Sequence, residues 1–124
     1  MNTKQTLTQK QALTSLREAW RTSIKNQVGL HPNAEYFARR LSETEEERKR
    51  NWYEAKLMPF PTALLLLQRE DGGSPLFLYG DTSRLPTRGL CWVLTWKNLL
   101  AGGYVAYLDA ITGEVFAIEI LIEG

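Results

Sequence analysis

The sequence has few of the residues that usually build catalytic and metal sites. Its 124 residues include one cysteine, Cys91, and one histidine, His31. A single cysteine excludes a disulfide framework within the chain and any zinc or iron–sulfur site made from several cysteines. A single histidine removes most metal-binding and acid–base arrangements. The glycine pairs at 72–73 and 102–103 fit no phosphate-binding or dinucleotide-binding motif. We therefore expect neither a metal nor a cofactor.

The sequence also lacks an excess of either charge and any long hydrophobic run. Fifteen lysines and arginines against fourteen acidic residues leave a net charge of +1, which gives no overall field toward nucleic acid or an anionic membrane. The longest apolar run, residues 63–67, is far shorter than the ~20 residues of a membrane helix. Residues 1–10 are polar and do not resemble a secretory signal. We expect a soluble cytoplasmic protein that binds neither membrane nor nucleic acid.

The first half of the chain has helical patterns. Thr8 and Gln11 form a capping box, and Gly29 and Pro32 end the helix that it begins. The apolar stripe of this helix is Leu13, Leu16, Trp20, Ile24 and Val28. A second helix from Asn33 is expected to bury Tyr36, Phe37 and Leu41. A third, charged helix over residues 42–57 begins with the capping box Ser42 and Glu45, and only Trp52, Tyr53 and Leu57 give it an apolar edge.

The second half has strand patterns separated by turn signals. Strands are expected at residues 62–69, 75–79, 90–96, 104–108 and 115–122, although the leucine-rich first segment also fits a buried helix. Asp71-Gly72-Gly73 and Asp109–Gly113 are the turns. In the last strand the even-numbered residues from Phe116 to Ile122 share the face toward the helices. The prediction is one α+β domain over residues 1–124, with a helical part (1–58) packed on a four- or five-stranded antiparallel sheet (59–124).

The last hairpin resembles the end of PepSY-type domains, which also occur in the propeptides of thermolysin-like proteases. The similarity lies in Val93, Tyr104-Val105 and the turn from Asp109 to Val115, and loosely in the start at Thr8–Ala12. The resemblance implies a helix packed on a small antiparallel sheet, without catalytic residues, in a module that binds or regulates a partner such as a protease. The charged segment 42–57 is an addition to that pattern, and PepSY domains are usually exported.

Few side chains are candidates for catalysis. His31 precedes Pro32 in a connection between helices, where a surface or capping role is common. Cys91 lies in an apolar strand, without the positive surroundings that produce a thiolate. The carboxylate pairs Asp71 with Asp81 and Glu114 with Glu119 fall in turns or on a strand face. We expect that the protein is not an enzyme, and a small enzyme would need a pocket around His31 or Cys91.

Aromatic residues on two successive strands are the main candidates for a protein-binding surface. They are Trp92 and Trp96 on one strand and Tyr104 and Tyr107 on the next. Their exposure depends on the strand register, because a two-layer fold leaves one sheet face uncovered. The predicted recognition surface is this outer face together with the loop Gly80–Gly89. Arg84 and Arg88 of the loop offer charge-assisted contacts to a partner.

Two other surfaces also suggest protein partners. The apolar last strand is either a well-packed core strand or, if it lies at an edge of the sheet, a strand that would pair with a partner or with a second copy. The basic residues of the charged helix alternate with glutamates, so a solvated face is favoured over nucleic-acid binding. We therefore expect a protein-interaction or regulatory module with a protein partner or a homo-oligomer. The alternative is a structural subunit of a larger assembly that docks through the helix 42–57.

Overall fold

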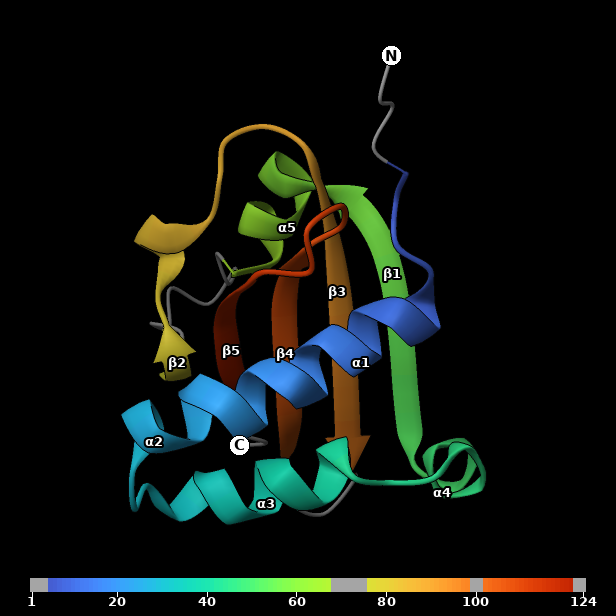
Figure 1. Ribbon diagram of the computed structural model, residues 1–124, viewed down its shortest axis with the longest axis vertical. Helices are drawn as coiled ribbons and strands as arrows, with labels where there is room; N and C mark the ends of the chain where they lie inside the picture. Colours follow the sequence, from blue (N-terminus) through green and yellow to red (C-terminus); the bar gives the residue numbers. More distant parts are fainter. Residues whose placement is uncertain (1–4, 68–75, 99–101, 122–124) are drawn as a thin grey trace.

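The computed structural model describes residues 5–67, 76–98 and 102–121, and its strands form one five-stranded antiparallel sheet. The strand order is β1-β3-β4-β5-β2. The helices precede most of the strands, so the predicted α+β class is confirmed (Figure 1). The strands are β1 (Trp52–Pro59), β2 (Leu76–Gly80), β3 (Leu90–Asn98), β4 (Gly102–Asp109) and β5 (Val115–Leu121). The α-helices are α1 (Gln9–Ala19), α2 (Lys25–Val28), α3 (Pro32–Leu41), α4 (Glu45–Arg50) and α5 (Phe60–Leu67).

The first helix runs as the sequence predicts. The Thr8 side chain accepts a hydrogen bond from the Gln11 amide, and the Gln11 side chain accepts one from the Thr8 amide. One π-helical turn, η1 (Trp20–Ile24), joins α1 to α2 without a break. The helix ends at Gly29, whose φ of 67° is a conformation that glycine adopts without strain.

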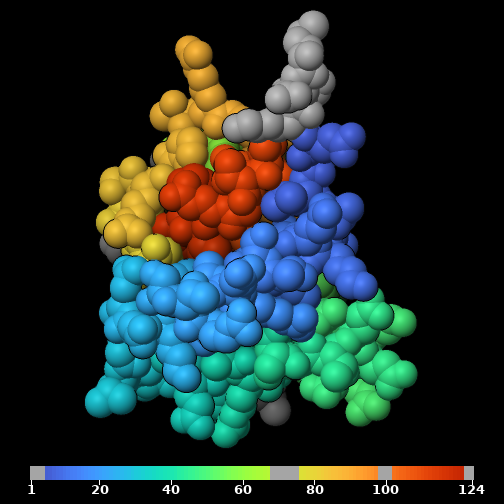
Figure 2. Space-filling view, in the orientation of Figure 1, coloured from blue at the N-terminus to red at the C-terminus, as the bar shows by residue number. Residues whose placement is uncertain are grey.

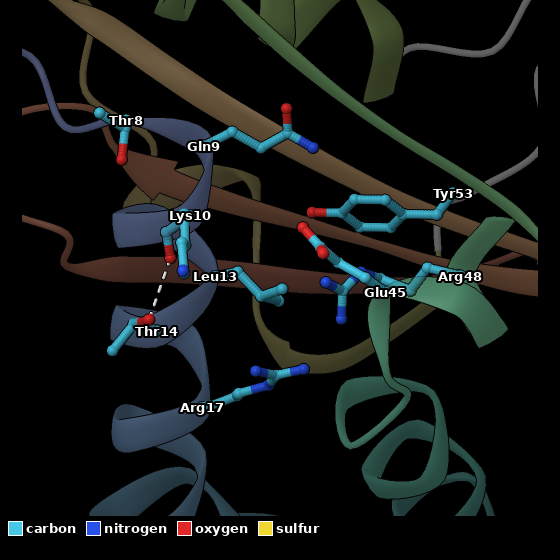
Figure 3. A pocket seen from close by; sticks show the side chains of 9 residues that line it. All are labelled: Thr8, Gln9, Lys10, Leu13, Thr14, Arg17, Glu45, Arg48 and Tyr53. Carbon is cyan, nitrogen blue, oxygen red and sulfur yellow. Dashed lines mark hydrogen bonds between the residues drawn. The ribbon is translucent and has the colours of Figure 1, made fainter.

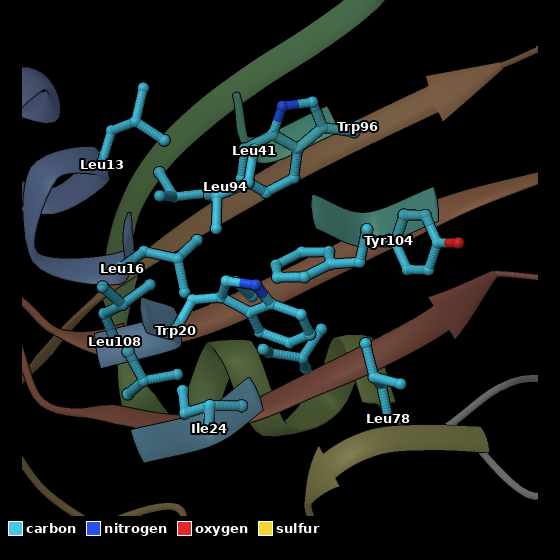
Figure 4. Close-up of a cluster of buried hydrophobic side chains, with 14 of the residues drawn as sticks. Leu13, Leu16, Trp20, Ile24, Leu41, Leu78, Leu94, Trp96, Tyr104 and Leu108 are labelled. Atoms are coloured by element: carbon cyan, nitrogen blue, oxygen red, sulfur yellow. The ribbon is translucent and has the colours of Figure 1, made fainter. Parts of the chain in front are cut away.

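The main core lies between this helix, α3 and one face of the sheet. Phe37 of α3 is fully buried at its centre, with ring centroids 5.0 Å from Trp20, 5.9 Å from Trp96 and 5.3 Å from Tyr104. Leucines and Ile24 fill the space around these rings (Figure 4). Phe37 and Leu41 are buried as predicted, whereas Tyr36 is 58% exposed.

The opposite face of the sheet is not open, because α5 covers part of it. Phe60, Ala63 and Leu67 of α5 pack against the sheet in a second buried cluster. The predicted strand at 62–69 is therefore wrong over its described part, Thr62–Leu67. Leucine and alanine favour helix, and Pro61 is well tolerated in a first helical turn. Arg69 and the turn Asp71-Gly72-Gly73 lie outside the described residues.

The predicted helix 42–57 divides into a short helix and a strand. Thr44, not Ser42, caps α4, and Asn51 has an extended conformation with ψ of 161°. From Trp52 the chain pairs with β3 as β1, so the division into 1–58 and 59–124 is not a boundary between helices and sheet. The side chains alternate across β1: Tyr53 and Ala55 pack on the α1 side, and Met58 on the α5 side. This alternation of side chains with a period of two residues is typical of a strand.

The turn between β4 and β5 confirms the local prediction. The Asp109 carboxylate accepts hydrogen bonds from the amides of Ile111 and Thr112 at 2.8 and 2.9 Å. Gly113 has a φ of 78°, and a Cβ on it would lie 2.5 Å from Ser15 Oγ of α1. Glycine is therefore needed for two reasons, the backbone conformation and the close approach of the helix.

The last strand differs from its prediction in face and in position. Ile118 and Ile120 face the helices as expected, but an irregularity opposite Tyr107 and Leu108 turns Phe116 toward α5 and Val115 toward α1. β5 also lies between β4 and β2, so it is not an edge strand. The edges are β1 and β2, and Pro75 and Ile122, the predicted ends of two strands, lie outside the described residues.

Candidate functional site

Three of the four aromatic residues proposed for partner binding are in the core. Trp96 and Tyr107 are 1% exposed and Tyr104 is 7% exposed. Trp92 is half-buried, and its Nε1 donates to the Leu7 carbonyl at 2.9 Å. The even-numbered residues of β3 face α1 and α3, while Cys91 and Val93 lie in the cluster beneath α5. The expected aromatic patch on an open sheet face is therefore wrong, because helices bury these side chains.

The loop arginines are exposed, as a recognition role would require. Arg84 donates to the Tyr79 hydroxyl at 3.1 Å, and its guanidinium lies 5.2 Å from the centroid of that ring. Leu85 is buried beneath the loop and anchors it. The Ser83 hydroxyl donates to Asp81 and lowers the pKa of that carboxyl. Arg88 is also exposed. The segment after β2 projects from the body of the molecule (Figure 2).

His31 and Cys91 are separated by the sheet. His31 Nδ1 accepts a hydrogen bond from the Asn33 amide at 3.0 Å and so caps α3. Cys91 is fully buried on the other face, where burial raises the pKa of its thiol to about 12. The Cys91 side chain therefore remains a neutral thiol at physiological pH. Over the described residues these two side chains form no catalytic pair.

The candidate carboxylate pairs are also separated or incomplete. Glu114 is exposed after the β4–β5 turn, whereas Glu119 is 2% exposed beside Tyr107, whose hydroxyl donates to Glu119 Oε1 at 3.4 Å. Asp81 is an exposed loop residue, and Asp71 lies outside the described residues. Within the described part of the chain, no group of three or more histidine, cysteine or acidic side chains is placed to hold a metal ion.

A concave site that sequence reasoning missed lies where α1, α4 and β1 meet. We call it the α1–α4–β1 groove. The pocket that contains both Arg17 and Arg48, which we call the main pocket, has a volume of about 360 Å³ and is lined by Thr8, Gln9, Lys10, Leu13, Thr14, Arg17, Glu45, Arg48 and Tyr53 (Figure 3). A second hollow of about 450 Å³ continues it along β1 and adds Lys49, Asn51, Trp52 and Glu54. Residues 40 positions apart in the chain meet here, which explains why no local pattern indicated the site.

Two arginines converge at the side of this groove. Arg17 of α1 donates to the Leu41 carbonyl at 2.7 Å and to the Glu43 carbonyl at 3.0 Å. Arg48 of α4 donates to the same Glu43 carbonyl at 2.6 Å. Burial lowers the pKa of Arg17, and the charge of Arg48 lowers it further. Neither arginine belongs to an ion pair among the described residues, and the hydrogen bonds that they donate there go to neutral carbonyls.

Glu43 anchors this junction from below. Its side chain is buried, and Oε1 pairs with Arg40 at 2.7 Å and accepts from Asn51 Nδ2 at 3.2 Å. The other oxygen, Oε2, is buried without a hydrogen bond among the described residues. The Glu43 side chain therefore links α3, α4 and the start of β1, and its backbone carbonyl accepts hydrogen bonds from both arginines of the groove.

Tyr53 supplies a polar group inside the groove. Its ring lies 5.1 Å from Trp96 and 5.5 Å from the Arg48 guanidinium, measured to ring centroids. Its hydroxyl is buried without a hydrogen bond among the described atoms. Burial raises the pKa of Tyr53, and Gln9, Arg48 and Arg17 oppose that shift. Figure 3 shows the ring between Gln9 of α1 and Glu45 of α4.

The charges of the groove favour an anionic group. Lys10, Arg17 and Arg48 line the main pocket against one acid, Glu45. Guanidinium and hydroxyl donors beside an open pocket suit a carboxylate, which accepts several hydrogen bonds at once. The described lining of the groove therefore supplies hydrogen-bond donors and positive charge.

Comparison with protein-family models, curated proteins and solved structures finds no match to this chain. Within the described residues, none of the helices is long and apolar enough to cross a membrane.

Proposed function

We propose that the chain is a non-enzymatic protein-interaction module that binds an acidic segment of a partner protein in the α1–α4–β1 groove. The observation that carries the proposal is the convergence of Arg17 and Arg48 on one carbonyl oxygen, with no acidic partner among the described ion pairs. An acidic side chain that enters the pocket would meet both guanidinium groups and the Tyr53 hydroxyl. Such charge-assisted hydrogen bonds are about twice as strong as neutral ones.

The surroundings of the groove favour a peptide over a nucleic acid. Glu45 lines the pocket, Glu54 lines its extension, and α4 carries Glu46 and Glu47 in its first turn. These acids would repel a continuous phosphate backbone. A pocket of about 360 Å³ accommodates one or two side chains. A short acidic segment therefore fits the charge pattern better than a strand of DNA or RNA.

The regulatory part of the proposal rests on the PepSY-like hairpin. The Asp109–Gly113 turn has the hydrogen bonds and the glycine conformation that its sequence predicts. Local turn chemistry favours the same geometry in any hairpin, so the resemblance supports a binding or regulatory role only together with the groove. We place this role in the cytoplasm, with a protein partner and without a cofactor.

The alternative is a structural subunit that docks through segment 42–57. The structure divides that segment into α4 and β1, and both border the groove. Exchange of the exposed lysine and arginine of the α4 C-terminus, Lys49 and Arg50, for glutamate would then abolish assembly. A regulatory module that binds an acidic ligand would instead respond most to Lys10, on the opposite side of the groove.

The test uses a fluorescent hexaglutamate peptide and measures its binding by fluorescence anisotropy at low salt. Lys10→Glu combined with Lys49→Glu should weaken binding about tenfold or more, because both charges lie at the rim. Glu45→Gln should strengthen it. The matched control is Arg21→Glu with Lys25→Glu, which changes the net charge equally on exposed positions that do not line the groove. Equal weakening by the two double variants would show nonspecific attraction and refute the proposal.

A pull-down with the tagged wild-type protein then identifies the natural partner. We expect a stoichiometric protein that survives nuclease treatment and is lost with Lys10→Glu alone, a change that docking through segment 42–57 would tolerate. Recovery that depends on nucleic acid would contradict the proposal.

A further inference from the structure

The strand β1 presents a long, regular edge of the sheet. All eight of its residues pair with β3 in an uninterrupted register, from Trp52 opposite Lys97 to Pro59 opposite Leu90. Among the described residues β3 is its one hydrogen-bonded neighbour. The other edge, β2, has five residues and an irregularity between Phe77 and Tyr79. A long and regular edge is a template for another strand, whereas a short edge with a bulge resists pairing.

The side chains of β1 leave apolar surface beside a central pair of charges. Trp52 is 61% exposed and Leu57 is 43% exposed. Between them, Glu54 and Lys56 form an ion pair of 3.0 Å on the α5 side. The strand therefore offers a partner backbone groups, apolar side chains and one charge of each sign.

We propose that β1 pairs antiparallel with β1 of a second copy of this chain, with Ala55 opposite the partner's Ala55. A two-fold axis perpendicular to the sheet keeps the same face of both copies on the same side, so every residue meets a residue of its own face. In this register Glu54 lies opposite the partner's Lys56, and Lys56 opposite the partner's Glu54. The two sheets become one continuous sheet across the axis.

The apolar residues match in the same register. Tyr53 meets the partner's Leu57 on the α1 side. Trp52 meets the partner's Met58 on the α5 side. Aromatic and aliphatic pairs directly opposite each other stabilise an antiparallel ladder by about 0.2–1 kcal/mol per pair. The two large exposed apolar residues of β1, Trp52 and Leu57, thus each gain an apolar neighbour.

The neighbouring symmetric registers place like charges together. Moving the axis to Glu54 brings that carboxylate opposite its own copy, and moving it to Lys56 does the same with the ammonium group. Like charges directly opposite each other destabilise a strand pair. The sequence of β1 is therefore self-complementary in one register, and this selects a second copy as the occupant. Trp52, Tyr53 and Glu54 border both this edge and the groove, but the inference rests on the pairing of the β1 edge and not on the arginines of the groove, so it can fail or hold separately from the proposed function.

The first test exchanges the two charges and measures mass in solution by light scattering or sedimentation velocity. The wild type should dimerise. Glu54→Lys alone and Lys56→Glu alone should each be monomeric at concentrations where the wild type is dimeric. An equimolar mixture of the two single variants, and the double exchange Glu54→Lys/Lys56→Glu, should both restore the dimer.

A matched control uses Glu18→Lys and Lys25→Glu, which make the same charge changes at exposed positions on the first helix. Each control variant should dimerise like the wild type. A wild type that stays monomeric at millimolar concentration would overturn the proposal, as would single β1 variants that dimerise as well as the wild type. The proposal would also be overturned if only a strand of another protein pairs with the β1 edge.

The second test fixes the register. Ala55→Cys places a thiol on the two-fold axis, so mild oxidation should produce a disulfide-linked dimer. Met58→Cys serves as control, because in this register the two thiols lie about six residues, or roughly 20 Å, apart. The native Cys91 is buried and should not crosslink. Equal crosslinking of both variants would reject this register even if a dimer forms.

Discussion

Arg17 and Arg48, which lie 31 positions apart in the chain on two different helices, donate to the same oxygen atom, the carbonyl of Glu43. The carbonyl lies between the end of α3 and the start of α4, so the two guanidinium groups fix that connection against α1. Two positive charges are thereby held close together beside an open pocket. The contact is both a brace for the fold and the source of the groove's charge.

The role of Arg17 in stability can be separated from the charge of the groove. Arg17→Met keeps much of the apolar stem but removes two charge-assisted hydrogen bonds to carbonyls, and should lower the free energy of unfolding by about 1–3 kcal/mol. Lys10→Met, at the exposed rim, should change it by less than about 0.5 kcal/mol. Urea denaturation of both variants makes the comparison. Equal losses would mean that the Arg17 contacts do not brace the fold.

Gly113 should tolerate substitution less well than Gly29. Both have positive φ, 78° and 67°, so alanine is strained at either position by about 1 kcal/mol or more. A Cβ at Gly113 also meets Ser15 Oγ at 2.5 Å, whereas nothing lies within 4 Å of one at Gly29. Gly113→Ala should therefore lower the free energy of unfolding more than Gly29→Ala, by about 1–2 kcal/mol. Thermal or urea denaturation tests this order, and a reversed order would contradict the packing of α1 on the turn.

Cys91 should be unreactive in the folded protein and should make stability depend on alkaline pH. Its pKa of about 12 lies above the ~8.5 of an unfolded thiol, so the unfolded state loses the proton first. The stability contributed by the neutral thiol is complete below about pH 8.5 and declines as pH rises toward 12. Thiol-reagent labelling at pH 8 should be undetectable without denaturant. Between pH 8.5 and 10 the wild type should lose stability more steeply than Cys91→Ala, and parallel profiles would contradict this.

The loop arginines should affect recognition more than folding. Arg84→Ala with Arg88→Ala removes one exposed hydrogen bond and one contact with the Tyr79 ring, and should change the free energy of unfolding by less than about 1 kcal/mol. Weaker binding of the natural partner with unchanged thermal stability would assign the loop to the recognition surface. If the double variant loses binding and stability equally, or loses neither, Arg84 and Arg88 do not belong to that surface.

Local signals in the sequence predicted what depends on neighbouring residues. The Thr8 capping box, the helix end at Gly29 and the Asp109–Gly113 turn all act within a few residues, and all were predicted correctly. The sequence left open which face of β3 meets the helices, and in the structure the even-numbered residues lie on that face. The fold class followed from these elements.

The errors arose where tertiary contacts decide the structure. Residues 52–57 were assigned to a helix and residues 62–67 to a strand, because acidic first turns and leucine runs carry no information about pairing with β3 or packing on the second face. The bulge at Phe116 was not visible in an alternating pattern. The groove brings together α1 and α4, whose meeting depends on Arg17 reaching past α3. No spacing of residues in the sequence indicates this contact between distant segments.

The strand order has a consequence for how the chain folds during synthesis. β3, β4 and β5 are consecutive and neighbouring, so they can form by local closure, which is fast. β1 and β2 are made earlier but lie at opposite edges, and the described partner of β2 is β5, the last strand. On a ribosome, β2 would therefore remain unpaired, with its apolar side chains exposed, until about forty more residues had emerged. A nascent chain paused within β4 should consequently be held by chaperones, and release should coincide with the appearance of β5.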